Sequence, residues 1–512
     1  MLGSADGRDP NFPMHKSLTE FPRLLKDFVS VCLGNYGAIL LSLAINVLLA
    51  RRLGAEGFGH LALFLMVSQI LSFFVANWTV SAVVRFGAQE FMDARCVAQT
   101  VWARTALVVP WLVLAGLLTF LFREPAAEYL RVPGWGVALV FVHFVLSSLL
   151  VTLAALFQAM RRMGQYGIAL FMDKLLTLTG ILILPVTLAR EPLAVLGCYL
   201  GGAGIVSAWA LCALGLKVFR PVRLDREVLG KVWRFSLPLI GTTWVSLLGT
   251  YWIDYVVINR FLSLSHLGLY SLANQVAGVV QQMTIISSAI LLPHFSVLVA
   301  KGDLEGVRRL VTRVVPLGFL ALSVLLGLFI LHAGPVIPRL FGQEFAASVP
   351  PLAILMVATI LMAFCNTFTP ILIAQGSTWI LMWITIPTAA VNIEMDLLLV
   401  PLLGINGAAI STVLAYATSA FLAMLVVGQR LGIPVVRNSL LGLPIVGVVL
   451  CSFFLQGLPL YITGLLVLGG SAYLLARMFA LWGTEEAGLL IRMILNRRRA
   501  AESAQASTEL GA

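Results

Sequence analysis

Charged side chains are scarce in this chain of 512 residues, and their scarcity excludes a soluble protein. Aspartate, glutamate, lysine and arginine together make up 11% of the sequence, whereas they make up about a quarter of a soluble domain. Hydrophobic residues make up 60%, and the mean hydropathy is +0.97. Strands of alternating polarity are absent, so helices are needed to satisfy the backbone in lipid. The composition therefore predicts an all-α polytopic membrane protein.

Motifs for catalysis and for metal or cofactor binding are also absent. The six cysteines show no C-x-x-C spacing, which argues against a disulfide framework or a metal site. No G-x-x-x-x-G-K-[ST] run occurs, so ATP hydrolysis at a P-loop is excluded. The longest expected outer loops, 123–136 and 333–348, hold three acids between them, which disfavours a membrane glycosyltransferase or ligase. We expect a protein that is not an enzyme and that needs no cofactor or metal.

Long apolar stretches are what the sequence does contain. A helix of about 20 apolar residues spans the hydrocarbon of a bilayer, and fourteen such stretches recur along the chain. Their even number places both termini on the same side of the membrane. The predicted spans are 28–50, 61–84, 106–122, 137–160, 168–189, 193–216, 236–261, 269–292, 314–332, 350–374, 379–400, 407–427, 440–455 and 460–481.

Lysine and arginine set the predicted orientation, because cytoplasmic loops carry an excess of both. Of the 34 such residues, seven lie in the expected outer loops, Lys174 lies within a span, and 26 lie at the opposite face. We therefore expect both termini in the cytoplasm. The net charge of +11 is interpreted as a signal for orientation and anionic lipid. Membrane lipid is an expected partner, and nucleic acid is not.

A segment near the N-terminus returns in altered form in the second half of the chain. The run LLARRLGAEGFGHLALF at 48–64 matches VINRFLSLSHLGLYSLA at 257–273. A shift of 209 residues places Gly59 on Gly268 and Arg104 on Arg313. Duplicated lobes around a midplane site are a common plan of membrane transporters, so the repeat predicts two pseudo-symmetric lobes.

A basic stretch marks the seam between the lobes. Residues 217–234 carry six basic and two acidic side chains and interrupt the apolar pattern. Six spans in each lobe would make the two repeats parallel. The predicted segments are a cytoplasmic N-terminal segment (1–27), an N-lobe (28–216), a cytoplasmic linker (217–235), a C-lobe (236–428), spans thirteen and fourteen (429–482) and a cytoplasmic tail (483–512).

Several turns resemble those of one transporter family. They are the R-x-L-G-x-x-x-F-G turn at 52–59, the LP…D…V-I pattern at 237–258, GLYSLANQ at 268–275 and VNIEMDLLLVPLLGINGAAIST at 391–412. These runs resemble the polysaccharide (oligosaccharide-lipid) flippases of the Wzx type. That family belongs to the MOP superfamily, which also holds the MATE drug exporters and the lipid II flippase. The resemblance covers about residues 30–428.

The resemblance implies a MATE-like fold and a function. Such a protein would move a polyprenyl-diphosphate-linked oligosaccharide from the cytoplasmic to the outer leaflet, by alternating access, for O-antigen, capsule or exopolysaccharide synthesis. It would lie in the bacterial inner membrane, with a polysaccharide polymerase and glycosyltransferases as further partners. The alternative is a MATE-like, ion-coupled exporter of drugs or other small molecules. Cavity charge separates the two, because cationic drugs favour acids and diphosphate lipids favour arginine, and the sequence offers both.

Four basic residues are candidates for binding the lipid diphosphate. Charge is costly to desolvate unless it is paired, and arginine matches phosphate with a rigid fork of donors. Arg51 and Arg260 occupy matching outer ends of spans one and seven, Arg85 closes span two at the inner face, and Lys174 is a deeper cation. The alternative for the arginines is that they anchor the helices at the lipid headgroups.

Neutral polar residues within the spans are candidates for binding sugar hydroxyls. We single out Asn46, Asn274 and Gln275. Such side chains also form hydrogen bonds that hold membrane helices together, and the sequence does not separate these two roles.

Asp254 is the strongest candidate for ion coupling. It lies within span seven, about 10 Å along the helix from the outer end. A carboxyl group at that depth must pair, face water or take a proton. The alternative is a structural hydrogen bond between helices.

Two other acidic positions are also candidates for coupling. Asp173 and Lys174 point about 100° apart on a helix, so we expect one to face the cavity and the other a neighbouring helix. A salt bridge to another span is the alternative. Glu394, with Asp396 two residues later, would bind a cation or relay protons, unless it only forms a polar helix end. The lone His143 is interpreted as a packing residue.

Overall fold

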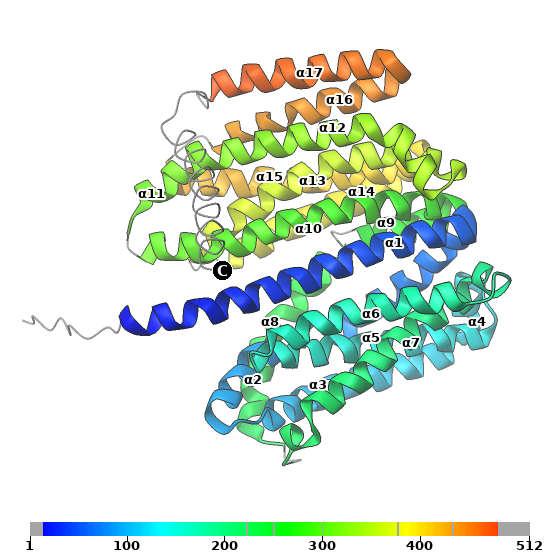
Figure 1. Ribbon diagram of the computed structural model, residues 1–512, viewed down its shortest axis with the longest axis vertical. Coiled ribbons are helices and arrows are strands. Elements are labelled where there is room, and N and C mark those ends of the chain that lie inside the picture. Colours follow the sequence, from blue (N-terminus) through cyan, green and yellow to red (C-terminus); the bar gives the residue numbers. More distant parts are fainter. Residues whose placement is uncertain are drawn as a thin grey trace, which may run out of the picture. The chain divides into compact units, whose positions relative to one another are not determined.

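The computed structural model describes residues 14–221, 224–248, 251–300, 302–375, 378–432 and 435–479 (Figure 1). Within these ranges the chain forms helices joined by short connections, and no β-strand occurs. The predicted all-α class is confirmed. Contacts divide the chain into two compact units, Met1–Trp244 and Val245–Ala512.

Unit 1 contains seven complete α-helices and the greater part of an eighth. They are α1 (Met14–Val75), α2 (Val80–Ala94), α3 (Ala98–Leu121), α4 (Arg123–Leu130), α5 (Gly134–Ala159), α6 (Met163–Ile183), α7 (Pro192–Leu214) and α8 (Arg226–Leu248). Three short 3-10 turns, η1 (Asn77–Thr79), η2 (Leu188–Arg190) and η3 (Leu216–Phe219), join some of them.

Unit 2 holds the remaining α-helices. They are α9 (Tyr251–Phe261), α10 (Leu264–Ala300), α11 (Leu304–Arg309), α12 (Val315–Phe341), α13 (Val349–Ala374), α14 (Thr378–Leu403), α15 (Ile405–Leu431), α16 (Leu443–Phe454) and α17 (Gly457–Met478). A π-helical turn, η4 (Leu310–Val314), leads into α12, and the 3-10 turns η5 (Gln343–Ser348) and η6 (Val435–Gly442) precede α13 and α16.

The helices are consistent with the predicted spans without matching each of them. Eleven segments of the described residues are long and apolar enough to cross a membrane. One of them, Leu33–Val75, covers most of the first predicted span and the first part of the second. These parts are successive stretches of α1, which loses helical geometry at Gly54, with φ 68° and ψ −179°. The second predicted span runs on through η1 into α2. Glycine tolerates that conformation. The count of fourteen is consistent with the structure.

The two units repeat the same helix-packing pattern. Gly54 corresponds to residue 263 under the shift of 209, and α9 ends at Phe261 while α10 begins at Leu264. Four helix pairs then pack in equivalent order in both units: α1 with α6 and α9 with α14, α2 with α5 and α10 with α13, α5 with α7 and α13 with α15, α6 with α7 and α14 with α15. The predicted pseudo-symmetric lobes are therefore confirmed.

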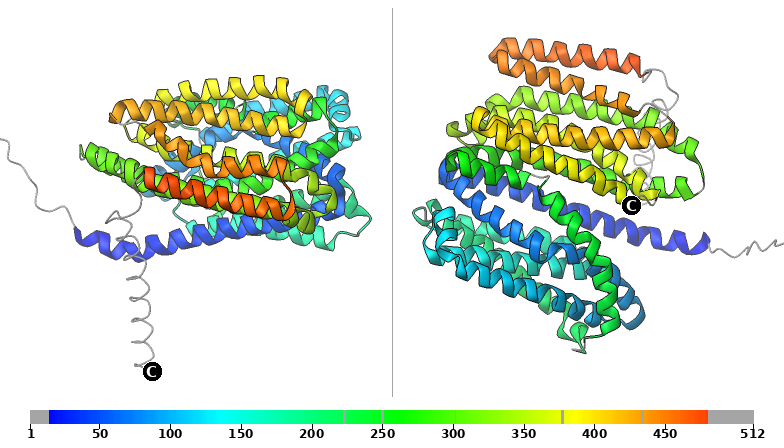
Figure 2. Two further views of the ribbon diagram at one scale, coloured as in Figure 1. Left: turned by 90° about the horizontal axis from the view of Figure 1, so that it is seen from above. Right: turned by 180° about the vertical axis from the view of Figure 1, so that it is seen from behind.

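The two C-terminal helices are an addition to the second lobe. Figures 1 and 2 show α16 and α17 lying side by side along α12. Leucine meets glycine reciprocally at this contact, because Leu331 of α12 packs on Gly464 and Leu468 of α17 packs on Gly327. The segment boundaries predicted around the basic seam stay predictions, since α8 begins at Arg226 and runs on into the seventh predicted span.

Small residues also allow close helix contact inside unit 1. Gly34 of α1 faces Gly167 of α6, and a Cβ atom added at Gly34 would lie 2.7 Å from the Gly167 carbonyl oxygen and nearer still to its Cα. Backbone cannot yield as a flexible side chain does. The approach of α1 to α6 therefore depends on glycine, as in other membrane helix contacts.

We expect Gly34→Ala to destabilise the protein by about 1–3 kcal/mol, the usual cost of overpacking. Thermal unfolding of the purified protein in detergent measures this effect. Gly164→Ala on α6 is the matched control, because a Cβ atom there meets nothing within 4 Å. Equal melting temperatures for the two variants would contradict the close contact of α1 with α6.

Candidate functional site

Asp254 is the centre of a buried polar cluster in unit 2. It lies in the first turn of α9, and its side chain is fully buried. Its Oδ2 accepts hydrogen bonds from the hydroxyl of Tyr270 on α10 and from Thr412 Oγ1 on α15, the latter at 2.8 Å. Its Oδ1 accepts from Asn392 Nδ2 on α14 at 3.0 Å. Three helices thus each donate to a single carboxyl group.

A second carboxyl group, that of Asp396, lies in the same cluster. Asp396 follows Asn392 by one helical turn on α14 and is also fully buried. The same Asn392 Nδ2 donates to Asp396 Oδ2 at 3.4 Å. The other oxygen, Oδ1, is buried and has no hydrogen-bond partner among the described residues. One amide nitrogen therefore bridges two acids, which we call the carboxyl pair.

No basic side chain compensates the carboxyl pair within the described residues. The ion pairs found there are Arg123–Glu124, Asp173–Lys174, Glu227–Lys231 and Glu305–Arg308. Two carboxylates this close repel each other, and burial penalises each charge further. The arrangement therefore requires a proton on one of the acids or a small cation between them, and such a pair titrates as a unit. Carboxylate and hydroxyl oxygens are also the ligands that hard cations prefer.

The structure brings together only part of the acidic set that the sequence singled out. Asp254 lies at the cluster as predicted. Glu394 is exposed, and Asp396 occupies the place in the cluster that was expected for Glu394. Residues two apart on a helix point in nearly opposite directions, so only one of these two acids can join the cluster. The spacing of four between Asn392 and Asp396 was the available signal, because such residues share a helix face.

Asp173 and Lys174 pair with each other rather than with separate helices. Lys174 Nζ lies 2.8 Å from Asp173 Oδ2 and 5.9 Å from the centre of the Tyr199 ring. Tyr199 belongs to α7, so Lys174 lies against a neighbouring helix, and the cavity-facing role of either side chain stays a prediction. Both side chains are partly buried.

His143 lies buried in unit 1 with both ring nitrogens in contact with serine hydroxyls. Nδ1 lies 2.7 Å from Ser68 Oγ, and Nε2 lies 3.2 Å from Ser147 Oγ. The ring also packs edge-on against Tyr199, with centroids 6.2 Å apart. These contacts agree with the interpretation of His143 as a packing residue.

The candidate arginines are exposed. Arg51 and Arg260 lie just before the break between the paired helices of each unit, Arg51 before Gly54 in α1 and Arg260 in the last turn of α9. The Arg85 guanidinium lies 4.8 Å from the centre of the Phe235 ring. Sequence reasoning missed Arg52, whose Nη1 donates to the Ile181 carbonyl at the end of α6 at 2.6 Å. The diphosphate-binding role stays a prediction.

The candidate amides differ in their surroundings. Asn274 is buried, and its Nδ2 donates to the Tyr255 hydroxyl at 3.3 Å, which joins α10 to α9. Asn46 and Gln275 are partly buried. This contact fits the alternative interpretation of Asn274, and the sugar-binding role of the three amides stays a prediction.

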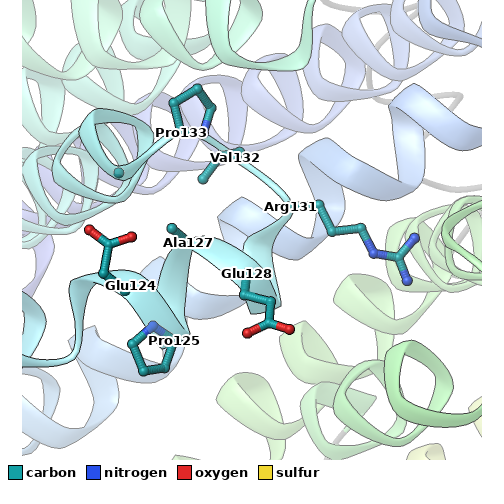
Figure 3. Close-up of a pocket in the computed structure, with 8 residues that line it drawn as sticks. Glu124, Pro125, Ala127, Glu128, Arg131, Val132 and Pro133 are labelled. Atoms are coloured by element: carbon teal, nitrogen blue, oxygen red, sulfur yellow. The ribbon is translucent and has the colours of Figure 1, made fainter.

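A surface hollow lies where α4 meets α5, in the first of the expected outer loops. It has a volume of about 790 Å³ and is lined by residues that include Glu124, Glu128 and Arg131. Figure 3 shows the two carboxylates directed to different sides of the hollow. Glu124 is also exposed and paired with Arg123 at 2.7 Å. The hollow does not bring two acids together as a hydrolytic or glycosyl-transfer site would.

Comparison with known sequences finds a matching family model and curated relatives. A family model described as polysaccharide biosynthesis protein matches residues 24–299. Succinoglycan biosynthesis transport protein ExoT of Rhizobium meliloti is 27% identical over 337 residues, which is 66% of this chain and 66% of ExoT. The probable low-salt glycan biosynthesis flippase Agl15 of Haloferax volcanii is 23% identical over 227 residues, which is 44% of this chain and 46% of Agl15. The matched regions span just under two thirds of ExoT and less than half of Agl15.

Solved structures share the architecture. The lipid II flippase MurJ in an inward closed conformation has a TM-score of 0.64 at 13% identity, over 88% of this chain and 100% of MurJ. An inward-facing MATE multidrug transporter of the MOP superfamily has a TM-score of 0.59 at 15% identity, over 77% of this chain and 94% of that protein. These likenesses show the fold. Because the family model covers more than half of the sequence, this multi-pass membrane protein belongs to the polysaccharide biosynthesis protein family.

Proposed function

We propose that this protein is a flippase that moves a polyprenyl-diphosphate-linked oligosaccharide from the cytoplasmic to the outer leaflet of the bacterial inner membrane. The observation that carries the proposal is the family match, which begins in α1 and ends in α10. The names of the relatives support it, since ExoT is a transport protein of succinoglycan synthesis and Agl15 a probable glycan flippase. A role in transport rather than catalysis follows.

The basic residues supply the proposed diphosphate path. Arg51, Arg85 and Arg260 are exposed, so a phosphate group can approach their guanidinium groups from solvent. Lys174 is held beside Asp173, and a more strongly charged diphosphate would compete with that single carboxylate. These cations suit an anionic substrate better than a cationic drug, which would need an acid-lined site.

The carboxyl pair supplies the proposed coupling to an ion gradient. A proton or small cation held between Asp254 and Asp396 neutralises charge at the meeting point of α9, α10, α14 and α15. Loss of that ion leaves two close, buried charges, so the helices would rearrange or admit water. Uptake and release would then favour different arrangements of unit 2, as alternating access requires.

The proposed diphosphate path is tested by replacing Arg51, Arg85, Lys174 and Arg260 singly with alanine. We expect each loss to lower polymer output at least about tenfold, because a charge-assisted hydrogen bond contributes about 1.5–3 kcal/mol. A complementation assay of surface polysaccharide measures output, with protein levels checked by immunoblot. Arg339→Ala, in another expected outer loop, controls for a general loss of charge. Unchanged output in all four variants would remove this path.

The protonation state of the carboxyl pair is tested by infrared spectroscopy. In buffer without alkali cations at neutral pH, we expect the carbonyl-stretch band of a protonated carboxylic acid, because the pair cannot bear two charges without a counter-ion. The band should change in frequency or area in Asp254→Asn and in Asp396→Asn, because each variant removes one member of the pair, and it should stay as in wild type in Glu394→Gln, whose acid is exposed. If added sodium removes the wild-type band, the pair also takes a cation. A wild-type spectrum without the band in either buffer would contradict the assignment.

Coupling itself is tested by reconstituted flipping of Asp254→Asn. The asparagine keeps the shape, and a turned Asn392 amide would accept from the new donor, so we expect the variant to fold. Because a titrating group is lost, flipping should slow by about tenfold or more and lose its response to an imposed pH gradient. Wild-type transport with an undiminished response would exclude Asp254 from the mechanism. The melting temperature of each variant shows whether a slow rate reflects misfolding.

A further inference from the structure

Arg104 is a buried arginine without an acidic partner in the described part of the chain. It lies on α3, and its side chain is 8% exposed. Its Nε donates a hydrogen bond to Thr79 Oγ1 at 2.9 Å, and Thr79 Oγ1 in turn donates one to the Ala76 carbonyl at 2.7 Å. No described carboxylate lies within ion-pair distance of it. A buried, uncompensated guanidinium is costly, so the fold keeps it at an energetic disadvantage.

The two nearest acids along the chain, Glu90 and Asp93, do not pair with Arg104. Glu90 accepts hydrogen bonds from the backbone N–H groups of Gln99 and Thr100 at 2.9 and 2.8 Å, which satisfies the first turn of α3. Asp93 is exposed. Neither acid neutralises Arg104, so its guanidinium can pair with an anionic group from outside these contacts.

A cavity of about 230 Å³ opens beside Arg104 within unit 1. Its volume is several times the share of one water molecule in the liquid, about 30 Å³. Apart from Arg104 and a few hydroxyl groups its lining is apolar, supplied by the end of α1, by α3 and by α5, with Val108 and Phe144 among the residues. Val109 and Leu149 are 43% and 36% exposed at its edge. The cavity thus joins one cation to an apolar chamber with an apolar rim.

Its hydroxyl groups are already committed as donors. Thr105 donates to the Val101 carbonyl, and Thr152 donates to the Ser148 carbonyl. Ser72 gives its proton to Asn77, so Ser148 must donate in its 3.1 Å bond with Ser72. The donors that remain for a ligand are the two terminal amino groups of Arg104. That pair forms a fork which matches two oxygens of one anionic group.

We propose that this cavity binds the phosphate group of a lipid, held by Arg104, with the first part of its hydrocarbon chain along Val108 and Phe144. A phosphate with two free oxygens satisfies the fork, and an apolar tail fits the rest of the lining. Free phosphate fits less well, because it would leave the apolar walls uncovered. Basic pockets between membrane helices bind lipid headgroups in this way. The site is independent of the proposed transport.

The second lobe offers a matched control. The shift of 209 residues places Arg313 at the position of Arg104, but Arg313 lies in the π-helical turn before α12 and is exposed. The duplicated arginine is therefore buried in unit 1 alone. Arg313→Gln removes the same charge from the equivalent place without touching the cavity.

Native mass spectrometry of the full-length protein in detergent tests the site. The probes are phosphatidylglycerol, a polyprenyl monophosphate, inorganic phosphate and a diacylglycerol with the same acyl chains as the phosphatidylglycerol. We expect wild-type protein and Arg313→Gln to retain at least one of the two lipid phosphates. Arg104→Gln should retain it at least about tenfold more weakly, the effect of losing a charge-assisted hydrogen bond. The better retained lipid identifies the source of the phosphate.

Three results would overturn the proposal: equal retention by Arg104→Gln and wild type, equal retention of diacylglycerol, or complete displacement of the lipid by inorganic phosphate. If Arg104→Gln does not fold, Arg104→Lys is measured in its place. Lysine keeps the charge but not the fork, so lipid retention should still fall. Retention that matches wild type in Arg104→Lys would then contradict bidentate binding.

Discussion

The low dielectric of the bilayer governs where each polar group of this protein lies. In hydrocarbon an unpaired polar group costs several kcal/mol, and the chain answers in three ways. Arg52 is paired with a helix-end carbonyl, Asp254 receives three donors, and His143 lies between two serines. Against that background the incomplete positions stand out. Among the residues that the structure describes, one oxygen of Asp396 has no hydrogen-bond partner and the Arg104 guanidinium has no counter-charge.

Local patterns in the sequence were sufficient to predict the helical plan. Apolar length predicted the spans, and the repeat predicted two lobes with equivalent packing. The turn expected at 52–59 contains the break at Gly54 inside α1. Each of these predictions depends on residues close together in the sequence or on the internal repeat. Two of the partners of Asp254 can be found in neither way. Asn392 and Thr412 lie 138 and 158 residues away along the chain, and their contact arises only when four helices pack together.

The acidic positions show where sequence reasoning reaches its limit. Glu394 and Asp396 have the same charge and nearly the same depth, and only the rotation of α14 decides which one is buried. Adjacent ionic residues such as Asp173 and Lys174 are also hard to place from the sequence. Their side chains leave the helix in different directions, but a long side chain can bend back to meet its neighbour. Arg104 appeared in the sequence only as a repeated residue. Its isolation depends on how α1, α3 and α5 enclose a cavity.

The duplication has lost its symmetry at the carboxyl pair. Under the 209-residue shift, Asp254 and Tyr270 correspond to Ile45 and Leu61, and both of these are almost completely buried. The second lobe thus holds an acid and its hydrogen-bond donor where the first lobe holds two hydrocarbon side chains. An ion bound at that position would change the charge of one half and leave its twin electrically silent. The two lobes would then respond unequally to the same ion gradient, because binding and release of the ion would change the packing of the second lobe alone.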